Sequence, residues 1–116
     1  MTEKIGVGID IINVTRFRNM PFEKKLSFYK KIFHDNEINY CLKFKDPYTH
    51  FAGKFAIKES VIKSINIKEN FLKIITDHNN KKPTVRISGK KDYTFSASIT
   101  HEKDYAIGVV IAKKIR

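Results

Sequence analysis

FAGKFAIKESVIK, at residues 51–63, is the strongest helical segment of the chain. Its large apolar side chains Phe51, Phe55 and Ile62 recur at helical spacing and give the segment a broad apolar side. With Thr49 as its cap, the pattern predicts a helix from Thr49 to about Ile65. Small residues stand between the large ones and allow the helix to approach a sheet closely; they are Ala52, Gly53, Ala56 and Ser60.

The segments upstream of this helix predict one strand and several shorter helices. Residues 5–12 are rich in β-branched side chains and predict a buried strand that ends near Asp10. A helix is expected to begin at Pro21 and to turn its apolar residues at i, i+4 and i+7 inward. Another short helix is expected around residues 34–43. The residues expected to face inward are Phe22, Leu26 and Tyr29.

The segments downstream predict strands. Residues 72–76 and 84–87 are strand-like and are joined by a turn-rich connection. Residues 95–100 alternate between apolar and polar, and residues 105–112 are apolar on both faces, which is typical of a central strand. The pattern indicates an α+β fold in which a mostly antiparallel sheet packs with one long central helix and shorter N-terminal helices. We expect one domain over residues 1–116.

The composition indicates a globular domain with excess positive charge. Lys and Arg number 23 against 12 Asp and Glu, and the resulting net charge of +11 favours a polyanionic partner. The lone Cys41 excludes a disulfide framework and a cysteine-based zinc site. No apolar run reaches the roughly 18 residues that a membrane span needs, and no signal-peptide pattern opens the chain. We therefore expect a cytoplasmic protein without a membrane partner.

Two carboxylates and a lysine are the first candidates for chemistry. Glu59 and Lys63 are four residues apart in the predicted helix, where an ordinary surface ion pair contributes about 0.3–0.5 kcal/mol. Asp10, from the end of the first predicted strand, adds a second carboxylate. Two carboxylates with a lysine nearby suit one Mg²⁺ and the phosphates that it bridges. Spacing alone leaves both interpretations open.

His101 is a weaker candidate, at the end of a predicted strand beside Ser98 and Thr100. A lone histidine at a strand end is usually structural or exposed, and the two hydroxyl residues fit the solvent side of a sheet equally well. The four histidines lack metal-ligand spacing. Gly6-Val7-Gly8 lacks the further residues of a phosphate-binding loop.

Three segments, taken in order, carry a family resemblance. They are GVGIDI at 6–11, FAGKFAIKESVIK at 51–63 and SITHEKDYA at 98–106. Together they resemble the holo-[acyl-carrier-protein] synthases, the small-subunit 4′-phosphopantetheinyl transferases, over residues 5 to about 112. The resemblance implies Mg²⁺-dependent transfer of 4′-phosphopantetheine from coenzyme A to a serine of apo acyl carrier protein, with release of adenosine 3′,5′-bisphosphate. It also implies a homotrimer whose active sites lie at subunit boundaries.

The resemblance also implies roles for particular residues. It makes Asp10 and Glu59 the Mg²⁺ ligands and Lys63 the cation on the coenzyme A diphosphate, and these three form the implied catalytic set. The implied coenzyme A contacts are Lys63, Lys82, Pro83, Ser98, Thr100 and His101. The chain departs from the family at two turns, because Lys81 replaces the glycine of a G-K-P turn and residues 64–68, SINIK, replace a glycine-rich turn that follows the helix.

The positive charge fits this resemblance, because acyl carrier proteins are strongly acidic. We expect the carrier to dock on Arg16, Lys24 and Lys31, with Phe28 as an apolar anchor; a merely solvated helix face is the alternative. A rival interpretation is a non-catalytic module that binds nucleic acid, which the charge and interleaved aromatic residues allow. Scarce arginine and the lack of a recognised motif count against a nucleic-acid partner. A third interpretation is a scaffold that binds acidic proteins without turnover.

Overall fold

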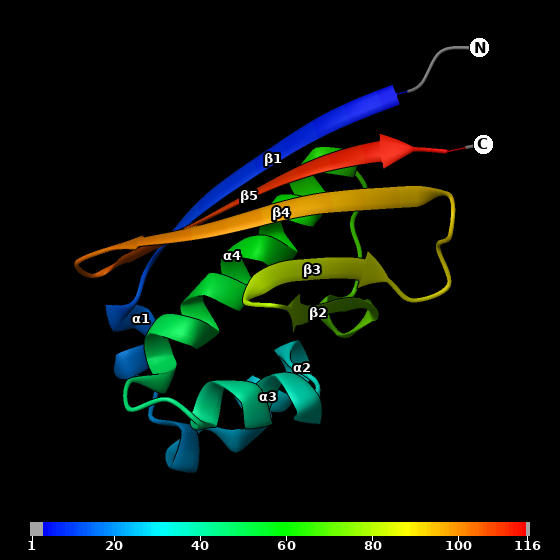
Figure 1. Cartoon of the computed structure of the whole chain (residues 1–116). Coiled ribbons are helices and arrows are strands. Elements are labelled where there is room, and N and C mark those ends of the chain that lie inside the picture. The colour runs from blue at the N-terminus through cyan, green and yellow to red at the C-terminus, as the bar shows by residue number, and fades with distance from the viewer. Residues whose placement is uncertain (1–3, 116) are drawn as a thin grey trace.

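The computed structural model describes residues 4–115 and has the predicted α+β fold (Figure 1). Its strands are β1 (Lys4–Asn13), β2 (Ile74–Asn79), β3 (Lys82–Ile87), β4 (Tyr93–Glu102) and β5 (Tyr105–Lys114). Its α-helices are α1 (Thr15–Arg18), α2 (Leu26–Ile32), α3 (Asp35–Leu42) and α4 (Pro47–Ile65). Two short 3₁₀ turns are η1 (Phe22–Lys24) and η2 (Phe71–Lys73).

The strands form two antiparallel sheets around α4. One sheet has the order β1-β5-β4, so β5 is the central strand that the apolar pattern of residues 105–112 predicts. The other is the β2–β3 hairpin. Figure 1 shows α4 beneath the three-stranded sheet, with α2 and α3 on the far side of the helix. The predicted antiparallel arrangement is confirmed, although it is divided between two sheets.

The helix α4 is the centre of the core because it is buried nearly all round. Every residue from 51 to 58 is buried, as expected for a helix that is enclosed on all sides. Phe51 and Phe55 join the aromatic cluster of the N-terminal helices, whereas Ile57 and Val61 join a second cluster with the strands. Among the helices described, none is both long and apolar enough to cross a membrane.

The strand β1 lies directly against the backbone of α4. A Cβ atom on Gly8 would stand 1.8 Å from the carbonyl oxygen of Ser60, and one on Gly6 would stand 1.8 Å from that of Ser64. Only glycine fits at either position. Because alternate residues of a strand face the same side, this contact turns the side chain of Asp10 toward the end of α4.

A buried ion pair fastens the surrounding elements to α4. Lys58 Nζ donates to Glu37 Oε1 at 2.8 Å and to the carbonyl oxygens of Ile32 and Phe71 at 2.7 and 3.0 Å. Glu37 Oε2 accepts from both the backbone and the hydroxyl of Thr76. Burial alone would raise the pKa of Glu37, but the Lys58 charge and these hydrogen bonds lower it below its ordinary value. The ionised pair therefore ties α2, α3, η2 and β2 to one helix.

Two expectations for the helices are wrong in detail. Leu26 is 44% exposed instead of facing inward, because Lys25 interrupts the helical backbone and α2 begins only after it. The long helix begins at Pro47, two residues before Thr49, because proline suits a first turn whose N–H groups have no helical partner. The Thr49 hydroxyl still stabilises this end by donating to Asp46 Oδ2 at 2.7 Å.

Asp10 lies inside the first strand rather than at its end. The strand runs on to Asn13, and Asp10 is paired in register with Gly108 of β5. At the other end of α4, Asn66 adopts the left-handed conformation with φ 55°, and its N–H donates to the carbonyl oxygen of Ile62. Asparagine therefore closes the helix where glycine is usual.

Candidate functional site

Asp10, Glu59 and Lys63 come together where β1 crosses the last turns of α4. Lys63 Nζ donates to Asp10 Oδ1 at 2.9 Å and to the carbonyl oxygen of Ile9 at 3.0 Å. Over residues 4–115, the ion pair of Lys63 is therefore with Asp10 and not with Glu59, its expected partner four residues earlier. Glu59 is half-buried one turn before Lys63.

Neither carboxylate is fully compensated by the groups around it. Burial raises the pKa of Glu59, and the nearby charge of Asp10 raises it further, while Lys63 and Arg16 oppose the shift. Asp10 Oδ2 is buried and has no hydrogen-bond partner among the described residues. One carboxylate oxygen thus lacks a donor, and the neighbouring carboxylate is disfavoured as an anion. A cation bound between them would relieve both conditions.

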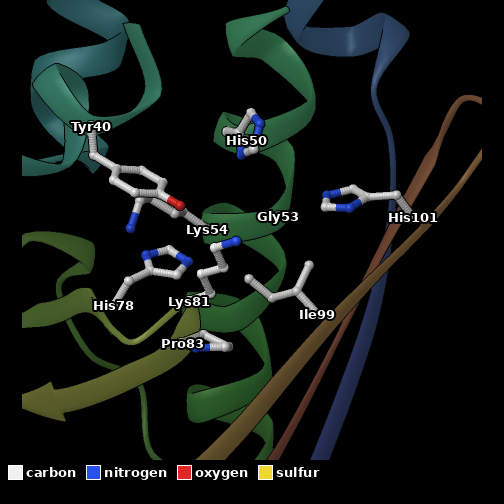
Figure 2. Close-up of a pocket in the computed structure, with 9 residues that line it drawn as sticks. All are labelled: Tyr40, His50, Gly53, Lys54, His78, Lys81, Pro83, Ile99 and His101. Atoms are coloured by element: carbon white, nitrogen blue, oxygen red, sulfur yellow. The ribbon is translucent and has the colours of Figure 1, made fainter. Parts of the chain in front are cut away.

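A second site opens on the other side of α4, and we call it the histidine pocket. It is a cavity of about 200 Å³ between α3, α4, β4 and the β2–β3 hairpin (Figure 2). Its lining residues are Tyr40, His50, Gly53, Lys54, His78, Lys81, Pro83, Ile99 and His101. Figure 2 shows the Tyr40 and His78 rings lying face to face, with the Lys54 side chain reaching toward them.

Lys54 puts a nearly desolvated positive charge into this pocket. It is only 2% exposed, and its Nζ donates to Thr76 Oγ1 at 3.0 Å. The ammonium also lies 4.7 Å from the centre of the Tyr40 ring. Burial lowers the pKa of Lys54, although Cys41, Glu37 and Asp77 raise it in part. A buried ammonium without a direct carboxylate partner favours the entry of an anion.

The structure brings some of the expected coenzyme A residues together and separates others. Pro83 and His101 line the histidine pocket, whereas Lys82 lies beside it at the start of β3. Ser98 and Thr100 are exposed on the other face of β4, which turns away from α4. The sequence had left this outcome open, because Ser98 and Thr100 alternate with the inward residues Ala97 and Ile99 and therefore also fit the solvent side of a sheet.

Sequence reasoning missed four of the residues in the histidine pocket: Tyr40, His50, Lys54 and His78. His50 and Lys54 are four residues apart on α4, but no regular spacing along the chain links them with Tyr40 of α3 or His78 of β2. One signal was available, because Gly53 is a poor helix former in the interior of the predicted long helix. A Cβ atom at that position would lie 3.3 Å from His101 Nε2, so the glycine leaves room where the helix faces the pocket.

The carboxylate pair and the histidine pocket lie at opposite edges of the three-stranded sheet. Asp10 belongs to the edge strand β1 and His101 to the other edge strand, β4, with β5 between them. On α4, Lys54 and Glu59 are five residues apart, which places them on different sides of the helix at about 100° per residue. Within one chain, the two sites are therefore separate surfaces.

The residues expected to dock a carrier protein lie on the N-terminal helices. Arg16, Lys24 and Lys31 are exposed on α1, η1 and α2. Phe28 is half-buried against the aromatic core, so only part of its ring is available as an anchor. Leu26 on the same helix is the more exposed apolar side chain.

Known proteins resemble this chain in both sequence and fold. The 4′-phosphopantetheinyl transferase superfamily matches residues 6–110. The holo-[acyl-carrier-protein] synthase of Thermodesulfovibrio yellowstonii is 38% identical over 109 residues, which are 91% of this chain and 96% of that protein. The synthase of Clostridium tetani is 33% identical, over 92% of this chain and 94% of its own.

Solved structures with the same fold come from the same family as the sequence relatives. The Helicobacter pylori holo-[acyl-carrier-protein] synthase, in complex with coenzyme A, has a TM-score of 0.81 and 30% identity, covering 91% of this chain and 98% of that one. The Bacillus anthracis synthase, in complex with CoA (3′,5′-ADP), has a TM-score of 0.83 and 27% identity, covering 97% and 99%. This chain therefore belongs to the 4′-phosphopantetheinyl transferase superfamily, among its holo-[acyl-carrier-protein] synthases.

Proposed function

We propose that this chain transfers 4′-phosphopantetheine from coenzyme A to a serine of apo acyl carrier protein in the cytoplasm. The products are the holo carrier and adenosine 3′,5′-bisphosphate. The observation that carries the proposal is the contact of Asp10 with Lys63 beside Glu59, in a member of this family. Relatives solved with coenzyme A support the choice of donor.

The carboxylate pair fits Mg²⁺. Mg²⁺ prefers oxygen ligands and is usually held by one or two carboxylates together with water and substrate phosphates. Asp10 and Glu59 would be these ligands, since Asp10 Oδ2 has no hydrogen-bond partner within residues 4–115 and Glu59 is disfavoured as a free anion. When bound, Mg²⁺ would neutralise charge on the diphosphate of coenzyme A.

The chain's own contribution to the transfer is positioning and charge. The serine oxygen of the carrier forms a bond to the β-phosphorus of coenzyme A, and the bond from that phosphorus to the bridging oxygen breaks. Adenosine 3′,5′-bisphosphate leaves with this oxygen, and the serine proton passes to a base. Lys63 neutralises negative charge on the diphosphate as a point cation, because such transfers depend on positioning and electrostatic stabilisation.

The histidine pocket is our candidate for the nucleotide end of coenzyme A. The aromatic rings of Tyr40 and His78 and the flat face of Pro83 offer surfaces for a base. Lys54 and His101 offer contacts for a phosphate group. Ser98 and Thr100 lie on the outer face of β4, away from this pocket. They remain proposed coenzyme A contacts only for a ligand that is held by a second subunit against this face.

The outer face of the three-stranded sheet supports a homotrimer with shared sites. Its apolar side chains include Val7, Ile9 and Ile11 of β1, which are 57–63% exposed, and Ile111 of β5, which is 49% exposed. An apolar face of this kind is typical of a protein interface. Because the carboxylate pair and the histidine pocket lie at opposite sheet edges, we propose that each complete site combines residues of two subunits.

Val7→Asp is expected to convert the trimer to monomers and to lower kcat/KM by at least about 100-fold. Val7 is paired in register with Ile111, and both side chains face away from α4, so the buried carboxylate would disrupt the interface without touching the core. Analytical ultracentrifugation measures the mass, and circular dichroism checks the fold. Thr84→Asp, at an exposed position of β3 in the other sheet, is the control. A monomeric variant with full activity would contradict the shared site.

Arg16→Glu is expected to raise KM for the carrier about tenfold and KM for coenzyme A much less. Arg16 is exposed on α1, where it would attract the acidic carrier, and salt should weaken this attraction. Lys91→Glu makes the same charge change at an exposed position outside the N-terminal helices and serves as the control. Equal changes in both KM values would contradict the docking surface.

The proposed function is tested by intact-protein mass spectrometry. Apo acyl carrier protein is incubated with this protein, coenzyme A and Mg²⁺, with and without EDTA. We expect the carrier to gain one phosphopantetheine, and we expect EDTA to prevent the gain. A folded protein that modifies none of several apo carriers would overturn the proposal and would favour a binding module.

A further inference from the structure

The ring nitrogens of two imidazoles in the histidine pocket have no role in the chemistry described so far. His78 on β2 stacks on Tyr40 of α3, with ring centres 4.3 Å apart and planes 13° apart. His50 on α4 stacks on Phe44, with centres 3.6 Å apart and planes 16° apart. Stacking fixes both rings in the wall of the cavity. His78 Nδ1 is buried and has no hydrogen-bond partner among the described residues.

Burial and the groups that face these rings disfavour their protonation. Burial lowers the pKa of His50, and His101 of β4 and Lys54 of the same helix lower it further, against a smaller opposing effect of Asp46. Burial also lowers the pKa of His78, as do Lys54 and His50 from α4, while Asp77 on its own strand opposes them. Apart from Asp46, Asp77 and Glu37, which lies behind Lys54, the charges named around the pocket are positive or potentially positive.

A phosphate monoester would reverse this balance. It carries close to two negative charges near neutral pH and is a strong hydrogen-bond acceptor. Placed beside Lys54, it would favour the charged form of any imidazole within a few ångströms. Each ring would then gain one proton from the solvent, and its second nitrogen would become a donor to the phosphate. No other co-reactant is needed.

We propose that His50 and His78 are ligand-binding residues that become protonated when the phosphate monoester of a nucleotide enters the histidine pocket. Binding then takes up protons, so the affinity increases as the pH falls from 7.5 toward 6. This inference rests on the proposed function, because coenzyme A carries such a phosphate on its ribose. By linkage, each full proton taken up strengthens binding about tenfold per pH unit.

The experiment is isothermal titration calorimetry of the full chain with coenzyme A and constant Mg²⁺. Titrations at one pH in PIPES and in bis-Tris, whose ionisation enthalpies differ, give the number of protons taken up. The variant His50→Phe/His78→Phe keeps both rings stacked but cannot be protonated. The phosphate of the ligand itself releases a fraction of a proton per molecule bound. The informative quantity is therefore the difference in proton uptake between the wild type and the variant.

We expect the wild type to take up more protons than the variant, up to one for each of the two rings, and to bind at least about tenfold more tightly at pH 6.5 than at pH 7.5. Dephospho-coenzyme A, which lacks the monoester, should abolish the difference. NMR titration of the imidazole C–H signals should show the pKa of both histidines rising on binding. Equal proton uptake by the wild type and the variant, together with histidine pKa values that do not change on binding, would overturn the inference. Failure of the wild type to bind coenzyme A at any pH would instead overturn the proposed function.

Discussion

Glu59→Gln is expected to lower kcat/KM for phosphopantetheine transfer by about 10³-fold or more, with the fold intact. The amide has the shape of the carboxylate but no negative charge, and it is a poor ligand for Mg²⁺. Because burial and Asp10 raise the pKa of Glu59 in the folded chain, the ionised group costs stability at neutral pH. That cost is absent below the unfolded pKa, grows as the pH rises from the unfolded to the folded value, and is complete above the folded pKa. The variant should therefore be at least as stable as the wild type at pH 7.

The measurement is single-turnover transfer at increasing Mg²⁺, followed by mass spectrometry of the carrier. We expect higher Mg²⁺ to restore little of the lost rate. Glu69→Gln makes the same chemical change in the connection after α4, where Glu69 only accepts from the adjacent Asn70 N–H, and it should leave the rate unchanged. A Glu59→Gln variant within tenfold of the wild type would show that Glu59 holds no metal.

The sequence could predict those parts of the fold that depend on local periodicity. The long helix, the alternating strand β4 and the doubly apolar strand β5 are all confirmed. Predictions failed where the backbone interrupts a pattern, as at Leu26, whose inward spacing assumes one continuous helix through Lys25. The position of Asp10 was also misjudged, since a strand's end depends on its partner strand and β5 pairs with β1 as far as Asn13.

For a similar reason, the sequence predicted the carboxylate pair and Lys63 but missed most of the histidine pocket. Asp10, Glu59 and Lys63 lie in segments with recognisable motifs, so their meeting could be anticipated. The histidine pocket joins side chains of α3, α4, β4 and the β2–β3 hairpin, and only the tertiary fold brings Tyr40 of α3 onto His78 of β2. Two turns that carry glycine in the family carry other residues in this chain. Asn66 and Lys81 adopt the left-handed backbone with φ values of 55° and 68°, so both turns form without glycine.

Gly8→Ala is expected to destabilise the protein by about 3 kcal/mol or more. The new Cβ atom would meet the carbonyl oxygen of Ser60 at 1.8 Å and its carbon at 2.7 Å, and both are backbone atoms of a regular helix. Neither can turn away as a side chain can. Relief requires β1 to move off α4, and that movement would separate Asp10 from Lys63 and Glu59. Activity should therefore fall even in the fraction of molecules that stays folded.

Urea denaturation of Gly8→Ala and Gly53→Ala provides the comparison. At Gly53 the new Cβ atom would meet side chains, with Ile99 Cγ2 at 3.1 Å as the nearest atom, and these can shift by a few tenths of an ångström. Alanine also favours a helix over glycine by about 1 kcal/mol, so Gly53→Ala should change the stability little or raise it. If the two variants unfold at similar urea concentrations, the close backbone contact between β1 and α4 is not what fixes the position of Asp10. If only Gly8→Ala unfolds early, that contact supports both the fold and the carboxylate pair.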